Sequence, residues 1–264
     1  SFNGRMVEIF GGQIIYFFKK LYLSIKLRNK YDFYLVIGDI VPIFFAWIAK
    51  KDFFTYLVAY SSHYEGKLKL PWPCKFFLLS KNAKKIYSRD FLTANDLTQQ
   101  LGKKVSFLGN PFMDKFSFFE NNSYLVDFSI GVFPGSRSPE TLDNLELILE
   151  VLEAMSSLKY FENIVFEFAI VNSLPIEKIK QILNHREWFS LEKTIKNNCL
   201  EYRYRSIKIN IKWNLFEEIL FNSKFVISMA GTASEQAIGL AKPVIQIEGK
   251  GPQFTKSFAE AQRR

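Results

Sequence analysis

The sequence predicts an α/β fold of two consecutive open units, each built on a parallel sheet. Short apolar runs alternate with helical segments, as parallel strands joined by crossover helices require. The alternation occurs twice, with a polar stretch near residue 120 between the two series. The 264 residues are 48% hydrophobic and 23% charged, which is enough apolar material for two ordinary cores. We therefore expect domains over residues 1–120 and 121–264, with the default binding site in the cleft between them.

The first unit is expected to open with a basic amphipathic helix over residues 7–27. Such a helix either covers a sheet or lies on a membrane surface. Covering a sheet is the simpler assignment, because every α/β unit needs helices of this kind. The apolar residues at helical spacing are Ile9, Phe10, Ile14, Phe17, Phe18, Leu21 and Ile25, with lysines between them.

Four strands are expected in the first unit, each marked by a short apolar run. A continuous run such as Phe33–Ile37 is typical of a strand buried in a parallel sheet. Pro42 suits the first turn of the helix that follows this strand. Another helix is expected over residues 88–102, with Gly102 at its end. The expected strands are residues 33–37, 53–60, 75–80 and 104–111.

The second unit repeats the alternation. Residues 199–212 alternate only in places and are expected to hold one or two short strands. The long helix after the first strand is expected to end at Met155. Further helices are expected over residues 174–183 and 213–223, and further strands over 128–133, 164–171 and both ends of 226–247.

Composition narrows the classes of partner. A formal net charge of +9 and a pI near 9.3 would attract phosphate-bearing partners such as nucleic acid, anionic lipid or a nucleotide, although a basic but otherwise ordinary surface is the simpler explanation. Nucleic acid has only the charge in its favour, since no motif of interleaved aromatic and basic residues accompanies it. Cys74 and Cys199 lie far apart and without metal-ligand spacing, so neither a metal site nor a disulfide framework is expected. The longest apolar run, Ile40–Ala49, is shorter than the roughly 20 residues that a membrane span needs.

Three turns of the second unit carry residues suited to phosphate, and each follows an expected strand. They should therefore share the carboxyl edge of one sheet, where α/β proteins bind ligands. In the first turn, Gly135 permits close backbone approach, Ser136 offers a hydroxyl and Arg137 a guanidinium. A plain turn with a solvated arginine explains this stretch equally well when it is taken alone.

The second turn opens a helix with a run of small residues. Small residues at a helix start leave backbone N–H groups free for an anion, so Gly231, Thr232 and Ser234 are expected around a diphosphate. Glu235 is placed to accept two ribose hydroxyls, or alternatively to complement the helix dipole.

The third turn spans residues 248–255. Here Gln253 is placed to reach a phosphate or a sugar hydroxyl, although a solvated surface loop has similar weight. The turns match neither the GxGxxG fingerprint nor a P-loop. A nucleoside diphosphate lying across several turns fits the pattern better than a dinucleotide does.

In the first unit, two strand ends carry polar residues. Asp39 follows the first strand and is either a general base or the N-cap of the next helix, the N-cap being the simpler role. Gly109 and Asn110 follow the last expected strand of this unit.

Four stretches resemble the signature blocks of bacterial lipid-A-disaccharide synthase-related proteins. These proteins are in turn similar to the synthase itself and, more distantly, to the N-acetylglucosaminyltransferase of peptidoglycan assembly. The longest block is the most specific, and the blocks follow the expected order. They are VIGDIVPIFFAW (36–47), FLGNPFMD (107–114), FPGSRSPE (133–140) and GTASEQAIGLAKPVIQIEGKGPQFTKSFAEAQ (231–262).

The resemblance implies a GT-B fold of two Rossmann-like domains that face a cleft, with the first domain incomplete and the end of the second missing. It implies inverting, metal-independent transfer from a UDP-sugar to a lipid-linked acceptor, without a cofactor. The expected location is cytoplasmic, with peripheral binding to the inner membrane face as an open alternative. It assigns the base to Asp39, the acceptor side to Gly109 and Asn110, and UDP binding to Gly135, Ser136, Arg137, Gly231, Thr232, Ser234 and Glu235.

Two further functions stay open. The synthase has Gly-His-Pro where this chain has Gly109-Asn110-Pro111, so the role of that histidine is not carried over. A UDP-sugar 2-epimerase shares the two-domain fold but would need additional acid/base residues, and the sequence has only 2 histidines. A truncated remnant that binds nucleotide without catalysis is the third alternative.

Overall fold

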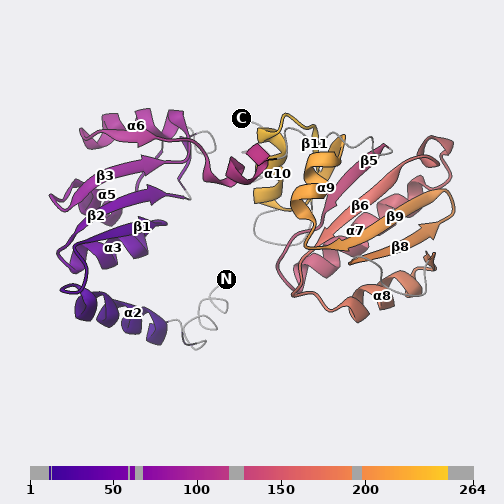
Figure 1. Cartoon of the computed structure of the whole chain (residues 1–264), viewed down its shortest axis with the longest axis horizontal. Coiled ribbons are helices and arrows are strands. Elements are labelled where there is room, and N and C mark those ends of the chain that lie inside the picture. Colours follow the sequence, from indigo (N-terminus) through magenta and orange to yellow (C-terminus); the bar gives the residue numbers. More distant parts are fainter. Residues whose placement is uncertain are drawn as a thin grey trace. The chain divides into compact units, whose positions relative to one another are not determined.

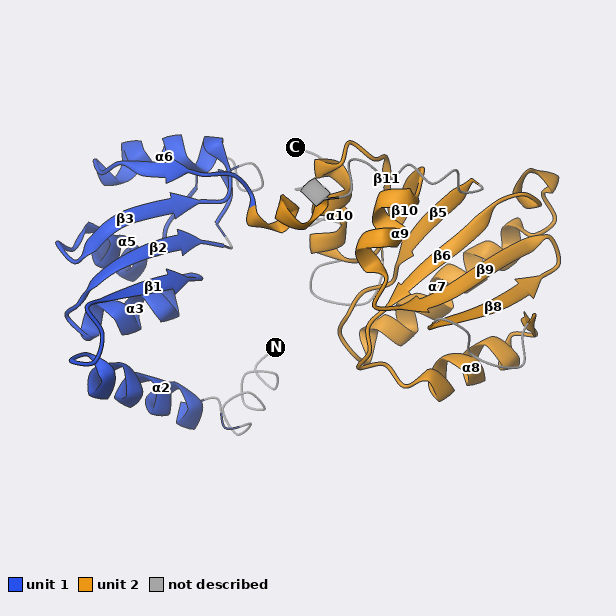
Figure 2. Ribbon diagram, in the orientation of Figure 1, with its two compact units in different colours: residues 1–110, 264 blue, residues 111–263 orange. Residues whose placement is uncertain are grey.

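The computed structural model describes residues 12, 14–58, 60–62, 68–118, 128–191 and 198–248. The chain divides into two compact units, one over residues 1–110 and one over residues 111–263 (Figure 2). The division falls between Asn110 and Pro111, ten residues before the expected boundary. Each unit has a sheet of its own and a hydrophobic core of its own.

The sheet of the first unit, called sheet A here, is parallel throughout, as the alternation predicts. Its four strands follow one another in chain order, from β1 at one edge to β4 at the other (Figure 1). The strands are β1 (Phe33–Ile37), β2 (Asp52–Leu57), β3 (Ala83–Ser88) and β4 (Val105–Phe107). The helices are α2 (Ile14–Leu27), α3 (Ile40–Ile48), α5 (Trp72–Leu79) and α6 (Phe91–Leu101).

The helices α3, α5 and α6 pack their apolar residues on a single face of sheet A. Val36, Phe53 and Ile86 on the strands form one buried cluster with residues of these helices. Because side chains alternate along a strand, the neighbours of Val36 point to the other face. There Leu35 and Ile37 are each 68% exposed, so the strand over Phe33–Ile37 forms as predicted but is not buried on both faces.

Helix α6 shows local signals that agree with its position. Its N-cap Asp90 accepts a hydrogen bond from the backbone N–H of Thr93 at 2.7 Å. Its C-cap Gly102 has φ +58°, the left-handed conformation that glycine adopts without strain. Both boundaries are therefore readable from the residue types alone.

The strand predicted over residues 75–80 is wrong, because these residues belong to helix α5. The burial of Cys74, Phe77 and Leu78 follows helical spacing, and Phe76 is 51% exposed. A short apolar run cannot distinguish a strand from a buried helix turn. The strand is instead β3, whose sequence AKKIYS has too few apolar residues to form a recognisable run.

Asp96 of α6 holds both ends of the connection that leaves β2. Its Oδ2 accepts from the Ser62 hydroxyl at 2.9 Å and from the backbone N–H of Leu68 at 2.8 Å. Gln100, one turn later, donates to the Leu68 carbonyl at 2.6 Å and to Asp96 Oδ1 at 2.8 Å. The described ends of this connection are thus fixed to α6.

The sheet of the second unit, called sheet B, has the strand order β11-β10-β5-β6-β9-β8-β7. Its first five members pair in parallel, whereas β8 pairs antiparallel with both β9 and β7, so the predicted parallel sheet continues into an antiparallel edge. Residues 199–212 hold two strands that form a hairpin, and their alternation follows from its solvated face.

The strands of sheet B are β5 (Ser129–Phe133), β6 (Val165–Ile170), β7 (Phe189–Ser190), β8 (Cys199–Tyr204), β9 (Ile207–Trp213), β10 (Phe225–Ser228) and β11 (Val244–Gln246). The helices are α7 (Glu140–Met155), α8 (Ile176–His185), α9 (Phe216–Asn222) and α10 (Gly231–Gly239), with 3-10 segments η2 (Pro111–Phe118) and η3 (Lys159–Phe161).

Helices cover both faces of sheet B. In Figure 1, α9 lies in front of the sheet and α7 behind it. Ile148 of α7 and Leu183 of α8 join the larger cluster with Phe166 and Phe168 of β6. On the other face, α9 and α10 pack with Phe133 and with Phe116 of η2. The sheet is therefore the middle layer of three.

The order of sheet B contains a reversal. From β5 the chain builds outward through β6 and β9, and it then returns to place β10 on the opposite side of β5. The backbone N–H of Met229 donates to the Phe133 carbonyl at 2.8 Å, so the ends of β10 and β5 are held together. Open α/β sheets have their ligand crevice at such a reversal.

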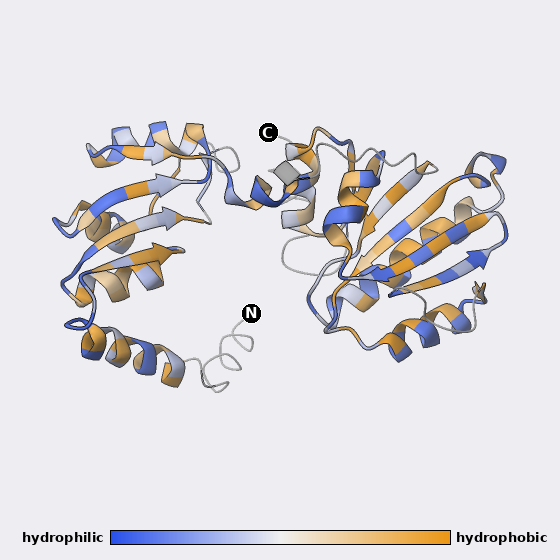
Figure 3. Ribbon diagram, viewed as in Figure 1, coloured by the Kyte–Doolittle hydropathy of each residue, from blue (hydrophilic) through white to orange (hydrophobic). Residues whose placement is uncertain are grey.

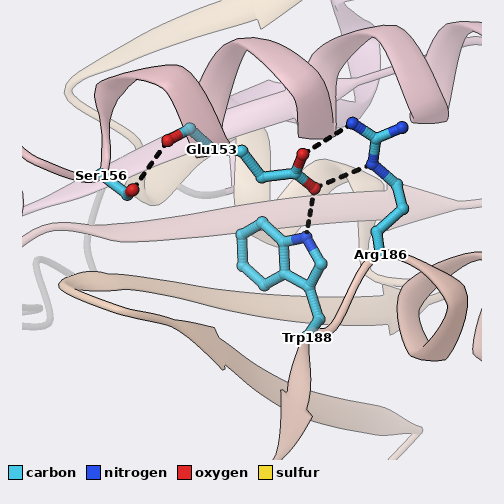
Figure 4. A network of polar contacts seen from close by, with 4 residues as sticks. All are labelled: Glu153, Ser156, Arg186 and Trp188. Atoms are coloured by element: carbon cyan, nitrogen blue, oxygen red, sulfur yellow. Dashed lines mark hydrogen bonds and ion pairs between the residues drawn. The ribbon is translucent and has the colours of Figure 1, made fainter.

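A half-buried ion pair joins α7 to the end of α8 (Figure 4). Glu153 accepts from Arg186 Nε at 2.8 Å and Nη2 at 2.6 Å, and from Trp188 Nε1 at 2.8 Å. Burial would raise the pKa of Glu153, but the hydrogen bonds from Arg186 and Trp188 and the charge of Arg186 hold it below its ordinary value.

Replacing Glu153 by Gln should lower the free energy of unfolding by about 1.5–3 kcal/mol at pH 7, the range for hydrogen bonds to charged groups. A depressed carboxyl pKa stabilises the fold fully above the unfolded value of about 4.3 and progressively less as the pH falls through the folded pKa. Urea unfolding of both proteins between neutral pH and pH about 3 measures the difference.

Glu150→Gln is the control, because this exposed glutamate lies one turn from Glu153 on the same helix. We expect it to change stability by less than about 0.5 kcal/mol. Equal effects of the two substitutions, or a Glu153→Gln effect that persists unchanged in acid, would show that the contacts of Glu153 with Arg186 and Trp188 do not stabilise the fold.

Candidate functional site

A cavity of about 440 Å³ opens at the carboxyl ends of β5 and β6 in the second unit. Its size falls within the range of small-molecule sites, and most of its lining is apolar. Three of the residues predicted from the sequence, Gly135, Ser136 and Thr232, line it. The complete lining is Phe133, Gly135, Ser136, Ala169, Ile170, Val171, Asn172, Asn214, Phe216, Glu217, Ala230, Thr232, Ala233 and Gln236.

The turn after β5 is built around Gly135. Its φ of +120° is a conformation that other residues rarely adopt. The buried side chain of Asn144 donates from Nδ2 to the Pro134 carbonyl at 2.9 Å and so fixes the turn from below. Ser136 is thereby presented at the cavity, whereas the exposed side chain of Arg137 is not among its lining residues.

The start of α10 presents backbone N–H groups beside this turn. Ala230 is the N-cap, and its methyl side chain cannot accept the hydrogen bonds that Ser, Thr, Asp or Asn would accept there. Ala230 and Thr232 both line the cavity. The first turn of α10 therefore directs uncapped donors and the positive end of its dipole to the cavity.

Two residues predicted on the same helix lie elsewhere. Ser234 is 0% exposed, and its hydroxyl donates to the Ala230 carbonyl at 3.0 Å and accepts from Gln246 Nε2 at 3.2 Å. It thus joins α10 to β11 from the interior. Glu235 is half-buried and does not line the cavity. Their assigned contacts with diphosphate and ribose stay predictions, and Gln253 lies outside the described residues.

Several lining residues are absent from the sequence prediction. Gln236 is 8% exposed and donates to the Phe112 carbonyl at 2.7 Å, which fixes η2 against α10. Glu217 pairs with Lys115 at 2.9 Å. Burial opposes the ionised form of Glu217, but the hydrogen bond from Lys115 and that from its own backbone, with the charge of Lys115, lower its pKa. Asn214, directly after β9, has φ +60°, a conformation that asparagine tolerates better than most residues. Its residue type is thus a sequence signal that could have indicated a turn here.

The predicted residues of the first unit occupy the carboxyl edge of sheet A. Asp39 is the N-cap of α3, but its side chain makes no capping hydrogen bond. Gly38 before it has φ +139°, which re-aims the chain from β1 into the helix. Gly109 and Asn110 follow β4. β1 and β4 are the two outermost strands of sheet A, with β2 and β3 between them. Asp39 and Asn110, which follow these outer strands, are therefore not neighbours.

Cys74 lies near Asp39 but is not a nucleophile. Burial is the main cause that raises the pKa of the Cys74 thiol to about 11. A hydrogen bond with Tyr60 lowers this pKa, and the negative charge of Asp39 raises it further. A thiol in such surroundings stays protonated at neutral pH.

The described residues contain neither a metal-binding group nor a membrane-spanning helix. No group of three or more His, Cys, Asp or Glu side chains within the described ranges is arranged to hold a metal ion. No helix in the described part of the chain is both long and apolar enough to cross a bilayer.

Comparison with known proteins gives structural neighbours. No family model and no curated protein matches the chain. A complex of S. aureus MnaA with UDP superposes with a TM-score of 0.56 at 14% identity, covering 94% of this chain and 69% of that protein. A candidate UDP-N-acetylglucosamine 2-epimerase from Listeria monocytogenes superposes with a TM-score of 0.56 at 13% identity, covering 94% and 64%.

At these identities the likeness establishes the fold. It confirms the predicted α/β class with Rossmann-like organisation. Neither neighbour is a lipid-A-disaccharide synthase by its description, so that finer resemblance stays a prediction.

Replacing Gly135 by Ala should lower the free energy of unfolding by about 1–3 kcal/mol, the cost of a residue held in a sparsely populated conformation. A methyl group there would lie 3.5 Å from Thr141 Oγ1 and 3.7 Å from the Met229 carbonyl, which are ordinary contacts, so the expected cost comes from the backbone conformation alone. Ser136→Ala, at the exposed next position, should change stability by less than about 0.5 kcal/mol. Urea unfolding of the two variants side by side measures this, and equal stability would show that the turn is not constrained.

Proposed function

We propose that the second unit binds the UDP portion of a nucleotide sugar at the cavity between β5, β6 and the start of α10. The observation that carries the proposal is the convergence of two donor-rich elements at the reversal of sheet B. The Gly135 turn and the first turn of α10 come from strands 96 residues apart in sequence but adjacent in the sheet. Two such elements at one mouth fit a diphosphate better than a single phosphate.

The rest of the cavity fits a nucleoside. Phe133, Ala169 and Phe216 supply apolar surface for a planar base and a ribose. Asn172 and Asn214 stand at the rim, where amide groups pair with the donors and acceptors of a pyrimidine. Both structural neighbours are described by UDP or a UDP-sugar, which supports this assignment.

For the reaction, we favour the interconversion of a UDP-sugar, as in a 2-epimerase. The neighbours support this reading better than glycosyl transfer, because one is a candidate UDP-N-acetylglucosamine 2-epimerase. Glycosyl transfer to a lipid-linked acceptor is the second candidate, favoured by the signature-like blocks around Asp39, Gly135 and Gly231. In either reaction, donors aimed at the diphosphate would stabilise the negative charge that develops on UDP when the anomeric C–O bond breaks.

Calorimetric titration of UDP tests the binding site, and product analysis separates the two reactions. The purified chain would be incubated with labelled UDP-N-acetylglucosamine, alone and with a bacterial lipid extract. An altered nucleotide sugar in both samples supports the epimerase. Label transferred to lipid supports the glycosyltransferase. UDP binding without either product supports a nucleotide-binding remnant, and no UDP binding refutes the proposal.

Asp39→Asn tests the base assignment within either reaction. The substitution keeps the shape of the side chain but removes its ability to take a proton. Turnover should fall by about 100-fold or more, the usual contribution of a positioned base. The dissociation constant for UDP should stay unchanged because Asp39 belongs to the first unit. Retained turnover would show that another residue is the base.

Ala230→Asp should separate stability from ligand binding. The backbone at Ala230, with φ −130° and ψ 120°, already has the conformation of an N-cap. An aspartate there would accept from the first-turn N–H groups and raise the free energy of unfolding by about 0.5–2 kcal/mol. The same carboxylate would compete with the diphosphate, so UDP affinity should fall about tenfold or more.

Ala230→Asn is the matched control, since it caps the helix without adding charge. It should stabilise the fold to a similar degree but weaken UDP binding less. If Asp and Asn both leave the affinity unchanged while stabilising the protein, the diphosphate does not use these amides.

A further inference from the structure

The helix α2 of the first unit has two apolar faces. One contains Phe17, Leu21 and Leu27, which are half-buried, and Phe17 stacks with Phe44 of α3 at 6.2 Å. The Tyr34 hydroxyl donates to the Ser24 carbonyl at 3.2 Å and fixes α2 on the helical side of sheet A. This face accounts for the packing of α2.

The other face of α2 is a solvent-exposed stripe. Its members at helical spacing are Ile15 at 74%, Phe18 at 61%, Tyr22 at 64% and Ile25 at 40% exposure. Positions three and four residues apart lie on one side of a helix. Single exposed apolar residues are ordinary, but a continuous stripe along a whole helix marks an interaction surface.

Aromatic rings continue this surface onto α3 and α5. Phe17 lies 5.6 Å from Phe18 on one side and 5.2 Å from Phe45 on the other. Phe44, in contact with Phe45, lies 6.4 Å from Trp47. The chain of rings proceeds from Trp47 through Phe76 to Trp72, at 5.6 and 6.2 Å. It ends in the open, because Phe76 is 51% and Trp72 is 77% exposed.

Along α2, hydrophobic residues alternate with hydrophilic ones, and its charged residues are all basic (Figure 3). Residues 14–31 contain Lys19, Lys20, Lys26, Arg28 and Lys30 but no Asp or Glu. Lys20 lies over the ring of Tyr16 at 5.1 Å, and Lys26 over that of Tyr22 at 5.9 Å. Such contacts hold the ammonium groups beside the apolar stripe instead of letting them extend away from it.

From this surface we infer that α2, with the exposed aromatics of α5, docks the first unit on an anionic lipid bilayer. Basic residues, tyrosines and a tryptophan beside an apolar stripe are the combination found in helices that lie in the membrane interface. The apolar side chains would enter the headgroup boundary, while the lysines and Arg28 meet lipid phosphates. A protein partner of ordinary composition would leave this density of positive charge uncompensated. The inference rests on the first unit alone and not on the UDP site.

Vesicle sedimentation tests the docking with the full chain. Vesicles of equal parts phosphatidylglycerol and phosphatidylcholine should bind it, and vesicles of phosphatidylcholine alone should bind it at least about tenfold more weakly. Binding should weaken when the salt is raised to about 0.5 M. Of the 4 tryptophans, Trp188 and Trp213 are buried and Trp47 is half-buried, so a blue shift on binding should come from Trp72 and disappear in Trp72→Phe.

Two variants address the surface itself. The double substitution Ile15→Gln with Phe18→Gln should weaken partitioning about tenfold, because both side chains lose their insertion into the interface. Lys19→Glu with Lys26→Glu should weaken it by about fivefold or more for each lysine. Circular dichroism and thermal melts confirm that each variant folds, since all four residues are exposed in the native state.

Matched controls lie on other surfaces of the same unit. Leu35→Gln with Ile37→Gln removes equally exposed apolar side chains from the opposite face of sheet A. Lys85→Glu with Lys104→Glu makes the same charge change away from α2. Neither pair should alter binding by more than about twofold.

Three outcomes would overturn the inference. The first is no binding to anionic vesicles, and the second is an equal loss of binding in the control variants. The third is a dimer in light scattering that dissociates in the Ile15→Gln, Phe18→Gln variant, which would make α2 a self-association surface. UDP titration of the same variants is a separate measurement. Lost vesicle binding with unchanged UDP affinity supports the docking. The vesicle experiment itself tests the docking even if the chain does not bind UDP.

Discussion

The pairing of β10 with β5 is the constraint on which the second unit depends. It requires the chain to return from β9 across the sheet and to place β10 beside a strand laid down almost a hundred residues earlier. The hydrogen bond from the backbone N–H of Met229 to the Phe133 carbonyl holds the carboxyl ends of the two strands side by side. The Gly135 turn and the start of α10 meet only because of this pairing. A cavity forms there because crossover helices leave the two strands toward opposite faces of the sheet.

The residues around the cavity divide into those that support it and those that face it. Asn144 and Ser234 are buried away from the cavity and hydrogen-bond to the carbonyls of Pro134 and Ala230. Gln236 does both, since it lines the cavity and donates from Nε2 to the Phe112 carbonyl. Gly135, Ser136 and the amides of α10 remain directed at the space itself. An uncapped helix start such as that at Ala230 costs stability in the free protein, and this cost is acceptable where a ligand completes the hydrogen bonds.

The first unit differs from the second in having its packed helices on one face of its sheet. Its helices cover one face of a parallel sheet, and the core gathers between them. Apolar side chains exposed beyond that core lie in two groups, one on α2 and α5 and the other on β1. The group on α2 has the rings of Tyr16 and Tyr22 in contact with Lys20 and Lys26.

The sequence by itself determined the class of the fold and most of its elements. Burial on both faces of a parallel strand gives a largely apolar run such as the one over residues 128–133, whose strand β5 is buried along its whole length. Capping residues such as Asp90 and Gly102 act locally. The sequence also indicated the Gly135 and Gly231 turns as candidate sites, since glycine permits close backbone approach and small residues at a helix start leave N–H groups accessible. It could not place β3 or the helix α5, whose apolar residues fit either period until packing against Phe53 and Phe44 selects one.

Only the tertiary structure decided which polar residues face the cavity and which serve the interior. Ser234 and Thr232 are of similar chemistry and lie two positions apart, yet one is turned into the sheet toward Gln246 and the other lines the cavity. Successive side chains of a helix point about 100° apart, so the packing of α10 on the sheet decides which of them face the cavity. That packing depends on contacts with β5, β10 and η2, and β5 and η2 are remote from α10 in sequence. For the same reason Gln236, Asn172 and Glu217 carried no local mark of the site that they line.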